Sequence, residues 1–425
     1  MLNLTFIRNQ TNEAIERLQK RNLPAQVIIS KILEADETRR RAQAQYEELK
    51  RKLNKLSEEV GIKMKLGDHS AAEIIKADVS ILKPQIQELE NKLREAESVL
   101  QEILISTPNL PHSSVIKGMD SSDNQIIRQY GKIPNSSDKV LPHWDLAKKF
   151  NLIDFDAGVK ITGSGFPVYV NQGARLQRAL IQFFLDTAVA AGYKEYQTPY
   201  VVNPASGFGT GQLPDKEGQM YHISQDDLYL IPTAEVPLTN LFRETILTED
   251  DLPIRLTAYS PCFRREAGSY GKDVRGLNRL HQFDKVEIVQ IVHPEKSYEV
   301  LQEMLNHVSM ILEKLELPYR ILKLCGGDLG FASAMTFDFE TYSAAQNRWL
   351  EVSSTSNFET FQSLRMKLRF KNKEGKILSP HTLNGSALAL PRVLASLLEY
   401  NQAEDHIRLP HCIHNYFGND RITLP

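Results

Sequence analysis

Residues 262–288, CFRREAGSYGKDVRGLNRLHQFDKVEI, concentrate charged side chains in a chain whose formal net charge is only −2. Arginines and lysines surround a glycine-bearing centre, and a phenylalanine and a glutamate stand four residues apart near the end. Arginine forks match phosphate oxygens, and an aromatic ring offers a flat face to a nucleobase. The stretch therefore predicts a nucleotide site. An exposed strand pair with surface ion pairs remains the open alternative.

The two flanks of this stretch have the pattern of β-strands, over residues 255–266 and 280–289. Alternation with period two puts Arg264 and Glu266 on one face of the first strand, and Phe283 and Glu287 on one face of the second. A hairpin would bring these four side chains together. The connection over residues 267–279 is longer than a hairpin needs, and long loops are often functional.

Upstream, apolar residues recur in steps of three and four over two segments, which predicts an antiparallel helical hairpin over about residues 27–105. A separate amphipathic helix is expected over residues 3–22, and Pro84 predicts a kink or a late helix start in the second segment. The seam residues are Ile28, Ile32, Ala35, Arg39, Ala42, Tyr46, Leu49, Leu53, Leu56 and Val60, then Val79, Leu82, Ile86, Leu89, Leu93, Ala96, Leu100 and Ile103.

Charge is uneven along the hairpin. Residues 31–65 hold ten Lys/Arg against seven Asp/Glu, whereas residues 66–105 hold four against eight. The densest basic clusters, Arg39-Arg40-Arg41 and Lys50-Arg51-Lys52, are compatible with a face that follows a phosphate backbone. They are equally compatible with the solvated flank of a coiled coil.

The rest of the chain mixes helical patterns with period-two strands such as KVEIVQIV and RWLEVSS, so we expect an α+β protein with an antiparallel sheet flanked by helices. A segment rich in Ser, Asp and Pro over residues 111–140 reads as a linker. Three scattered cysteines fit a reducing compartment, and no stretch has the features of a signal peptide or a membrane span, so a cytoplasmic location is expected.

The charged stretch resembles motif 2 of class II aminoacyl-tRNA synthetases, in the version carried by seryl-tRNA synthetases. TPYVV (198–202), after the helical pattern of 176–193, is similar to the dimer-forming motif 1. YLIPTAEVPLTN (229–240), EVSSTSN (351–357) and HTLNGSALALPR (381–392) follow in the family's order, and the last resembles motif 3. The heptad hairpin is similar to the family's tRNA-binding arm. The resemblance covers nearly the whole chain and implies a tRNA-binding domain over 1–110, a linker over 111–140 and a catalytic domain over 141–425.

For the nucleotide, the resemblance implies that Arg264 holds the α-phosphate and the serine carboxylate, with Arg265 and Glu266 completing the ATP segment and Glu266 near the adenine. Phe283 would lie under the adenine ring, and Arg392 would pack on its other face and reach the γ-phosphate. Glu351 and Ser354 resemble the pair that holds Mg²⁺, and Val352 and Ser353 lie between them in the ATP-binding segment. Period two separates Glu351 from Ser354, so this pair requires a bulge or a strand end.

For the amino acid, the resemblance points to Glu287 and Ser386 together with Thr233, Ala234 and Glu235, and Asn384 is expected to assist. Either Glu235 or Glu287 would complement the ammonium group. A buried hydrogen-bonding site rejects alanine, and limited space rejects threonine. Thr233 also suits the N-cap of a helix, and both roles remain open. Arg264, Glu287 and Arg392 are the expected catalytic residues.

The implied activity is that of a serine–tRNA ligase, which forms seryl-adenylate from serine and ATP and passes serine to the 3′ end of serine tRNA. A homodimer is implied, and charging of selenocysteine tRNA stays open. The arm would bind the long variable arm of the tRNA, and Lys272 and Arg275 of the glycine-bearing loop would meet its acceptor end. Two alternatives are kept: a ligase that charges a carrier protein, and a non-catalytic RNA-binding paralogue.

Overall fold

The computed structural model describes residues 1–133, 140–267 and 275–425, which form two compact units. One unit contains residues 1–19 and 23–108, and the other contains residues 20–22 and 109–425. Lys272, which was expected to meet the tRNA acceptor end, lies outside the described residues. Among the residues that the structure describes, no helix is long and apolar enough to cross a membrane.

The first unit consists of four helices: α1 (Leu4–Asn9), α2 (Thr11–Gln19), α3 (Ala25–Lys65) and α4 (His69–Ser106). The single helix expected over residues 3–22 is wrong, because Gln10 leaves the helical conformation (φ −134°) and divides it into α1 and α2. The Thr11 hydroxyl donates to the carbonyl of Ile7 (2.8 Å) at this break.

The helices α3 and α4 form the predicted antiparallel hairpin, and every seam residue named above is buried or half-buried. The turn contains Gly67 in the left-handed region (φ +75°), and the Asp68 side chain caps α4 by accepting from the amide of Ala71 (3.2 Å). The late helix start considered at Pro84 is wrong, because α4 begins at His69 and continues through the proline.

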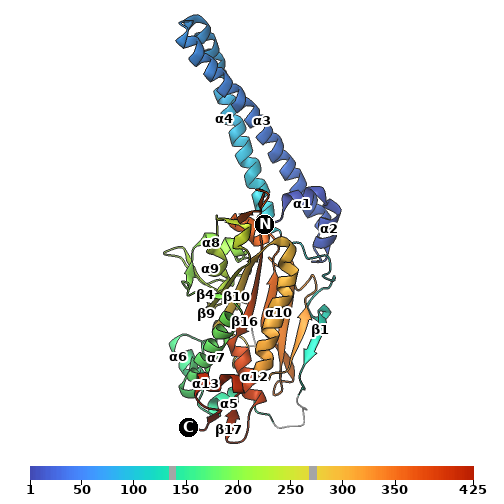
Figure 1. Cartoon of the computed structure of the whole chain (residues 1–425), viewed down its shortest axis with the longest axis vertical. Coiled ribbons are helices and arrows are strands. Elements are labelled where there is room, and N and C mark those ends of the chain that lie inside the picture. The colour runs from blue at the N-terminus through green and yellow to red at the C-terminus, as the bar shows by residue number, and fades with distance from the viewer. Residues whose placement is uncertain (134–139, 268–274) are drawn as a thin grey trace. The chain divides into compact units, whose positions relative to one another are not determined.

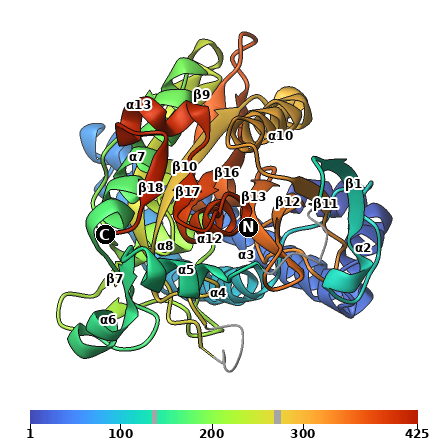
Figure 2. The ribbon, with the colours of Figure 1, turned by 90° about the horizontal axis from the view of Figure 1, so that it is seen from below.

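The second unit is built on an eight-stranded sheet, antiparallel except for its last pair, in the order β1-β11-β12-β13-β16-β10-β9-β4. Figure 2 shows the strands from β9 to β1 following one another in this order. The α+β architecture is therefore confirmed. The strands are β1 (Gln125–Tyr130), β11 (Tyr319–Lys323), β12 (Met335–Ser343), β13 (Arg348–Asn357), β16 (His381–Ala389), β10 (Gln282–Val292), β9 (Ile254–Phe263) and β4 (Lys194–Glu195).

The expected linker over residues 111–140 is only partly a linker. It carries β1, which pairs with β11 at the edge of the sheet, and residues from 109 onward belong to the second unit. Sequence composition alone did not reveal this strand because all six of its side chains are exposed. Without a buried face it shows no apolar alternation.

The two faces of the sheet have opposite character because side chains alternate along each strand. Val286 and Ile288 of β10 and Leu383 of β16 belong to the main hydrophobic core. That core also contains side chains from α7 (Asn171–Ala190), α10 (Ser297–Lys314) and α12 (Leu390–Tyr400), which Figure 1 shows alongside the sheet. The intervening residues of β10, β13 and β16 face the other side, where the polar residues gather.

Shorter elements complete the second unit. The helices α8 (Pro204–Thr210), α9 (Glu235–Asn240) and α11 (Phe361–Met366) pack together beside the polar face. The remaining elements are α5 (His143–Lys149), β2 (Ile153–Asp154), α6 (Phe155–Ile161), β3 (Val168–Tyr169), β5 (Val201–Val202), β6 (His222–Ile223), β7 (Leu228–Leu230), β8 (Ile246–Thr248), β14 (Arg369–Lys371), β15 (Ile377–Leu378), β17 (His406–Arg408), α13 (His414–Phe417) and β18 (Arg421–Thr423).

Candidate active site

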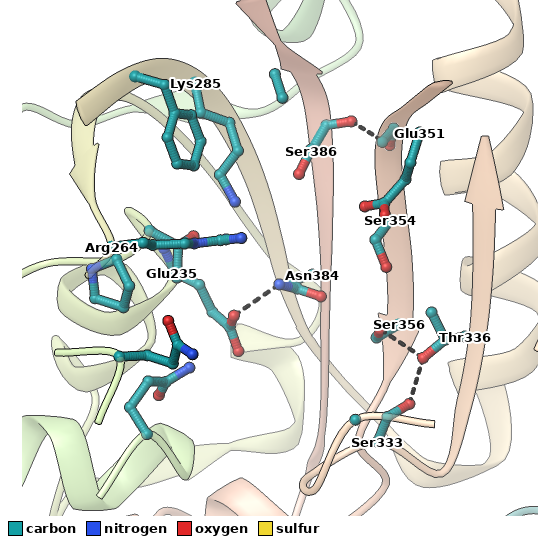
Figure 3. A pocket seen from close by; sticks show the side chains of 18 of the residues that line it. Glu235, Arg264, Lys285, Ser333, Thr336, Glu351, Ser354, Ser356, Asn384 and Ser386 are labelled. Carbon is teal, nitrogen blue, oxygen red and sulfur yellow. Dashed lines mark hydrogen bonds between the residues drawn. The ribbon is translucent and has the colours of Figure 1, made fainter. Parts of the chain in front are cut away.

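The polar face of the sheet carries a cavity of about 750 Å³. It collects most of the residues that the sequence singled out, from strands far apart in the chain (Figure 3). Of the predicted ATP and serine residues, those that line it are Thr233, Glu235, Arg264, Glu266, Phe283, Glu351, Val352, Ser353, Ser354, Asn384, Ser386 and Arg392. Ala234, Arg265 and Glu287 do not line it.

Arg264 lies where β9 ends and β10 begins. Strand β9 ends at Phe263, just before it, and the Arg264 amide donates to the carbonyl of His281 (2.9 Å). Its guanidinium lies 5.1 Å from the centre of the Phe283 ring. A cation over an aromatic face is stabilised and kept in place. The charge therefore stands beside a flat apolar surface, as a nucleotide site requires.

The neighbours of Arg264 in the chain diverge. Arg265 is exposed, and its backbone amide donates to the carbonyl of Gln219 (2.9 Å). Glu266 adopts a left-handed conformation (φ +49°), which turns its carboxylate toward an ion pair with Arg279. Of the Arg-Arg-Glu segment, the first and third residues thus reach the cavity.

Glu287 lies wholly buried behind the cavity wall. Its carboxylate forms an ion pair with Lys285 and accepts from Thr233 Oγ1 (3.0 Å) and Asn384 Nδ2 (3.2 Å). Thr233 Oγ1 also accepts from the amide of Glu235 (3.2 Å), so this hydroxyl both supports the first turn of α9 and holds the carboxylate. Lys285 lines the cavity, and no role was assigned to it from the sequence.

The buried Glu235 and the half-buried Asn384 form a second polar pair, turned toward each other in Figure 3. Asn384 Nδ2 donates to Glu235 Oε2 (2.7 Å), while Asn384 Oδ1 is buried with no partner among the described residues. Burial, and then the negative charge of Glu287, raise the pKa of the Glu235 carboxyl to about 7. A ligand with a positive charge and N–H donors would satisfy both groups.

The bulge that the Mg²⁺ pair requires is present in β13. Phe339 of β12 pairs with Ser353 and the next residue, Glu340, pairs with Glu351, so Val352 is the extra residue. This bulge turns Glu351 and Ser354 to the same side of the strand, toward the cavity. Ser353 instead donates to the carbonyl of Ser386 (2.6 Å).

Arg392, in the first turn of α12, connects two parts of the cavity rim. Its Nη1 donates to the carbonyl of Glu351 (2.9 Å), and its Nε donates to the carbonyl of Asn278 (3.0 Å). A buried histidine anchors the same rim, because the amide of Leu277 donates to Nε2 of His143 (2.9 Å). The other ring nitrogen of His143 bonds the Glu399 carboxylate (2.9 Å), which fixes the tautomer.

Of the residues predicted to bind tRNA, none that the structure describes lines this cavity. Arg275 packs over Trp144 (4.6 Å to the ring) at a smaller pocket of about 410 Å³. Arg39 and Arg41 form ion pairs with Asp36 and Glu37 within α3. The remaining arm candidates are exposed: Arg40, Lys50, Arg51 and Lys52.

Comparison with known proteins identifies the family. Residues 1–111 match the seryl-tRNA synthetase N-terminal domain, and residues 221–401 match the class II tRNA synthetase core domain for G, H, P, S and T. A serine–tRNA ligase of Salinibacter ruber is 49% identical over 99% of both chains. The chain belongs to the seryl-tRNA synthetase family. This membership confirms the expected enzyme class, a class II aminoacyl-tRNA synthetase of the serine–tRNA ligase type.

Further similarities support the same family. A serine–tRNA ligase of Delftia acidovorans is 45% identical over 99% of both chains. The crystal structure of seryl-tRNA synthetase from Pyrococcus horikoshii complexed with ATP superposes with a TM-score of 0.91, at 32% identity and over the full length of both chains. The fold predicted for this synthetase from its motifs is therefore confirmed.

Some residues of the synthetase's cavity were missed by sequence reasoning. Period two places Lys285 between Phe283 and Glu287 on one face of the strand, but no role in the site was assigned to it from the sequence. Asp338 does not line the cavity, but it stands opposite Ser354 in the β12–β13 register, and its buried Oδ1 has no partner in the part of the chain that the structure describes. Burial and the nearby Glu351 raise the pKa of Asp338 well above its usual range. No motif in the sequence marks Asp338.

Proposed function

We propose that the cavity binds ATP and serine side by side and joins them as seryl-adenylate, from which serine passes to the 3′ end of serine tRNA. The observation that carries this proposal is the chemistry of two adjoining corners. One holds the Arg264–Phe283 stack and Arg392, which suit a nucleotide. The other holds the buried Glu235 carboxylate and the unpartnered Asn384 oxygen, which suit an ammonium group.

In the nucleotide corner, Phe283 would carry the adenine and Arg392 would lie on its opposite face and reach the γ-phosphate. Arg264 would hold the α-phosphate and the serine carboxylate, and Glu266 would lie near the adenine. Phosphoryl transfer needs positioning and charge neutralisation more than covalent help from the protein. The stacked, cavity-lining guanidinium of Arg264 meets that need.

Mg²⁺ fits the residues of β13. Glu351 and Ser354 offer hard oxygen donors on one side of the bulge, and Asp338 stands opposite Ser354 with one carboxyl oxygen that has no partner among the described residues. Glu351 and Ser354 would hold the ion, and Mg²⁺ bound there would neutralise charge on the triphosphate. A cation held there would offset the repulsion from Glu351 that, after burial, raises the pKa of Asp338.

The first chemical step forms a bond between a serine carboxylate oxygen and the α-phosphorus and breaks the bond to pyrophosphate. No general base is required, because the serine carboxylate is already ionised at neutral pH. In the second step a terminal ribose hydroxyl of the tRNA attacks the carbonyl carbon and an ester forms. The bond from that carbon to the phosphate oxygen breaks, AMP leaves with the bonding electron pair, and the hydroxyl proton passes to solvent. Arg264 remains beside the departing phosphate throughout.

Selection of serine rests on the buried polar groups around Glu235. Thr233, Ser386 and Asn384 line that corner, and Glu287 lies directly behind it. A buried group that loses its hydrogen-bond partner costs about 1–3 kcal/mol, so a ligand without the hydroxyl binds poorly. The added methyl group of threonine must instead be excluded by the close packing of the corner.

We further propose which partners the chain binds and how it divides into domains. The basic side of α3 would contact the variable arm of serine tRNA, within a tRNA-binding domain over residues 1–110. The segment around α7 and β5, which carries the resemblance to motif 1, would form a homodimer contact in a catalytic domain over residues 141–425. The enzyme would act in the cytoplasm. No observation favours a carrier-protein ligase or a non-catalytic paralogue.

The test is amino-acid-dependent exchange of pyrophosphate into ATP, with Mg²⁺ present and with serine, threonine, alanine, glycine and cysteine compared. Exchange with serine should exceed exchange with alanine by at least about a thousandfold in kcat/KM, as expected for a site built to bond a hydroxyl. Folded protein that shows no exchange with any amino acid would contradict the proposal.

A further inference from the structure

Gln362, on α11, lies directly behind Glu235 and is not part of the cavity lining. Its side chain is almost completely buried (1% exposed). The amide nitrogen Nε2 donates to Glu235 Oε1 (2.7 Å) and to the carbonyl of Thr210 (3.2 Å). Gln362 therefore contacts the carboxylate from the side opposite to a ligand in the cavity.

The orientation of the Gln362 amide is fixed by its surroundings. The Thr382 hydroxyl donates to Gln362 Oε1 (2.7 Å), and the carbonyl of Thr210 can only accept, so the N–H donors must point toward Glu235. If Glu235 Oε1 carried a proton, its O–H would face the N–H of Gln362, and two donors would oppose each other. Asn384 donates to the second oxygen, Oε2, in the same way. Both oxygens are thus arranged for the ionised carboxylate.

We propose that Gln362 is a positioning residue for serine binding, which keeps Glu235 ionised and aimed at the ammonium group of serine. The inference rests on the role proposed for Glu235. Burial and Glu287 favour the protonated form of Glu235 and bring its pKa to about 7, while the hydrogen bond from Gln362 and the charges of Lys285 and Arg264 oppose them. Gln362 is uncharged, unlike Lys285 and Arg264. Its hydrogen bond therefore supports the ionised Glu235 without placing a positive charge where the ammonium group of serine would bind.

The experiment measures the KM for serine in pyrophosphate exchange from about pH 5.5 to about pH 8.5, for wild-type enzyme and Gln362→Met. Methionine keeps the length and apolar packing but removes the donor. In Gln362→Met, the pH below which the serine KM rises should be about one unit higher than in the wild type. The reason is that a hydrogen bond to a charged group is stronger than one between neutral groups. Below pH 7 the serine KM of the variant should then be about tenfold higher than that of the wild type, and at pH 8.5 the difference should be smaller, since one pKa unit is a factor of ten. The KM for ATP and kcat should change by less than about twofold.

Ser363→Ala is the matched control. Ser363 is the next residue of α11, is equally buried and donates to the carbonyls of Thr360 and Pro380, so it tests packing without touching Glu235. It should leave the pH dependence of the serine KM unchanged. If Gln362→Met does not fold, Gln362→Glu keeps the shape and places a second carboxyl group against Glu235, which should displace the pH dependence still further upward.

A Gln362 variant with an unshifted pH dependence would overturn the inference, whatever its effect on stability. The proposed role of Glu235 itself is tested separately by Glu235→Gln. An unchanged serine KM in that variant would overturn the ammonium site, whereas a raised KM there with no effect at Gln362 would overturn only the positioning role. A shift in the Gln362 variants, absent from Ser363→Ala, supports both.

Discussion

The helical arm and the cavity wall use charged residues in opposite ways. In α3, Arg41 and Glu37 pair across one helical turn with side chains 75% and 60% exposed. At the cavity, the wall residue Lys285 pairs with Glu287 behind it, and these side chains are 6% and 0% exposed. An exposed pair contributes about 0–1 kcal/mol, whereas breaking a buried pair costs about 3–5 kcal/mol. Charges on the arm can therefore exchange partners, for instance with phosphates, while charges in the cavity are held in one geometry.

The largest effect expected from this comparison is at Arg264. Arg264→Ala should lower kcat/KM for pyrophosphate exchange by at least about a thousandfold, because it removes the positive charge stacked over Phe283. Arg264→Lys should recover only part of this loss, since an ammonium group lacks the planar fork. Steady-state exchange kinetics at saturating serine provide the measurement. Arg369→Ala removes an exposed arginine outside the cavity lining and serves as the control.

Glu235 should show the energetic cost of a buried charge. Its pKa is raised from an ordinary value of 4.5 to about 7 in the folded state, so its contribution to stability is full below about pH 4.5 and is lost as the pH rises through 7. Relative to Glu235→Gln, which does not titrate, the wild type should lose about 3 kcal/mol of unfolding free energy between pH 4.5 and 8. Urea denaturation of both proteins at the two pH values measures this. A difference between the proteins that does not depend on pH would contradict the prediction.

The sequence predicted those features that depend on a repeating pattern. Heptad spacing gave the α3–α4 hairpin and its seam. Period two gave the β9–β10 pair and the shared face of Phe283 and Glu287, which the register confirms. Patterns of this kind follow from backbone geometry, so one chain is enough to read them. The single helix over 3–22 failed because the break at Gln10 is not a property of hydrophobic spacing.

What the sequence could not predict depends on contacts between distant parts of the chain. Gln362 reaches Glu235 across 127 residues, through the packing of α11 beside α8 and the sheet. The bulge at Val352 was recognised as necessary for Glu351 and Ser354, yet only the pairing with β12 locates it. Arg392 and Ser386 entered through resemblance to a family rather than through their own spacing.

The smallest effect is expected on the arm, where charges are exposed. Arg40 and Arg51 are both solvent-exposed, and their eleven-residue separation makes about three turns, so they lie on one side of α3. Arg40→Glu combined with Arg51→Glu should raise the KM for serine tRNA about tenfold and make its dependence on salt shallower, because phosphate contacts are lost. Aminoacylation assays at several salt concentrations measure both quantities.

The matched control for the arm reverses two exposed lysines of the other helix, Lys83→Glu with Lys92→Glu. Because α4 is acidic, its phosphate contacts should be few, and this variant should change the KM for tRNA by less than about twofold. Pyrophosphate exchange should be unaffected in both double variants, since the described residues that line the cavity all belong to the second unit. Equal losses from the two helices would mean that net charge, rather than the face of α3, governs tRNA binding. Lost exchange would mean that the substitutions disturb the fold or the cavity, which would contradict the independence of the exposed arm charges from the buried charges of the site.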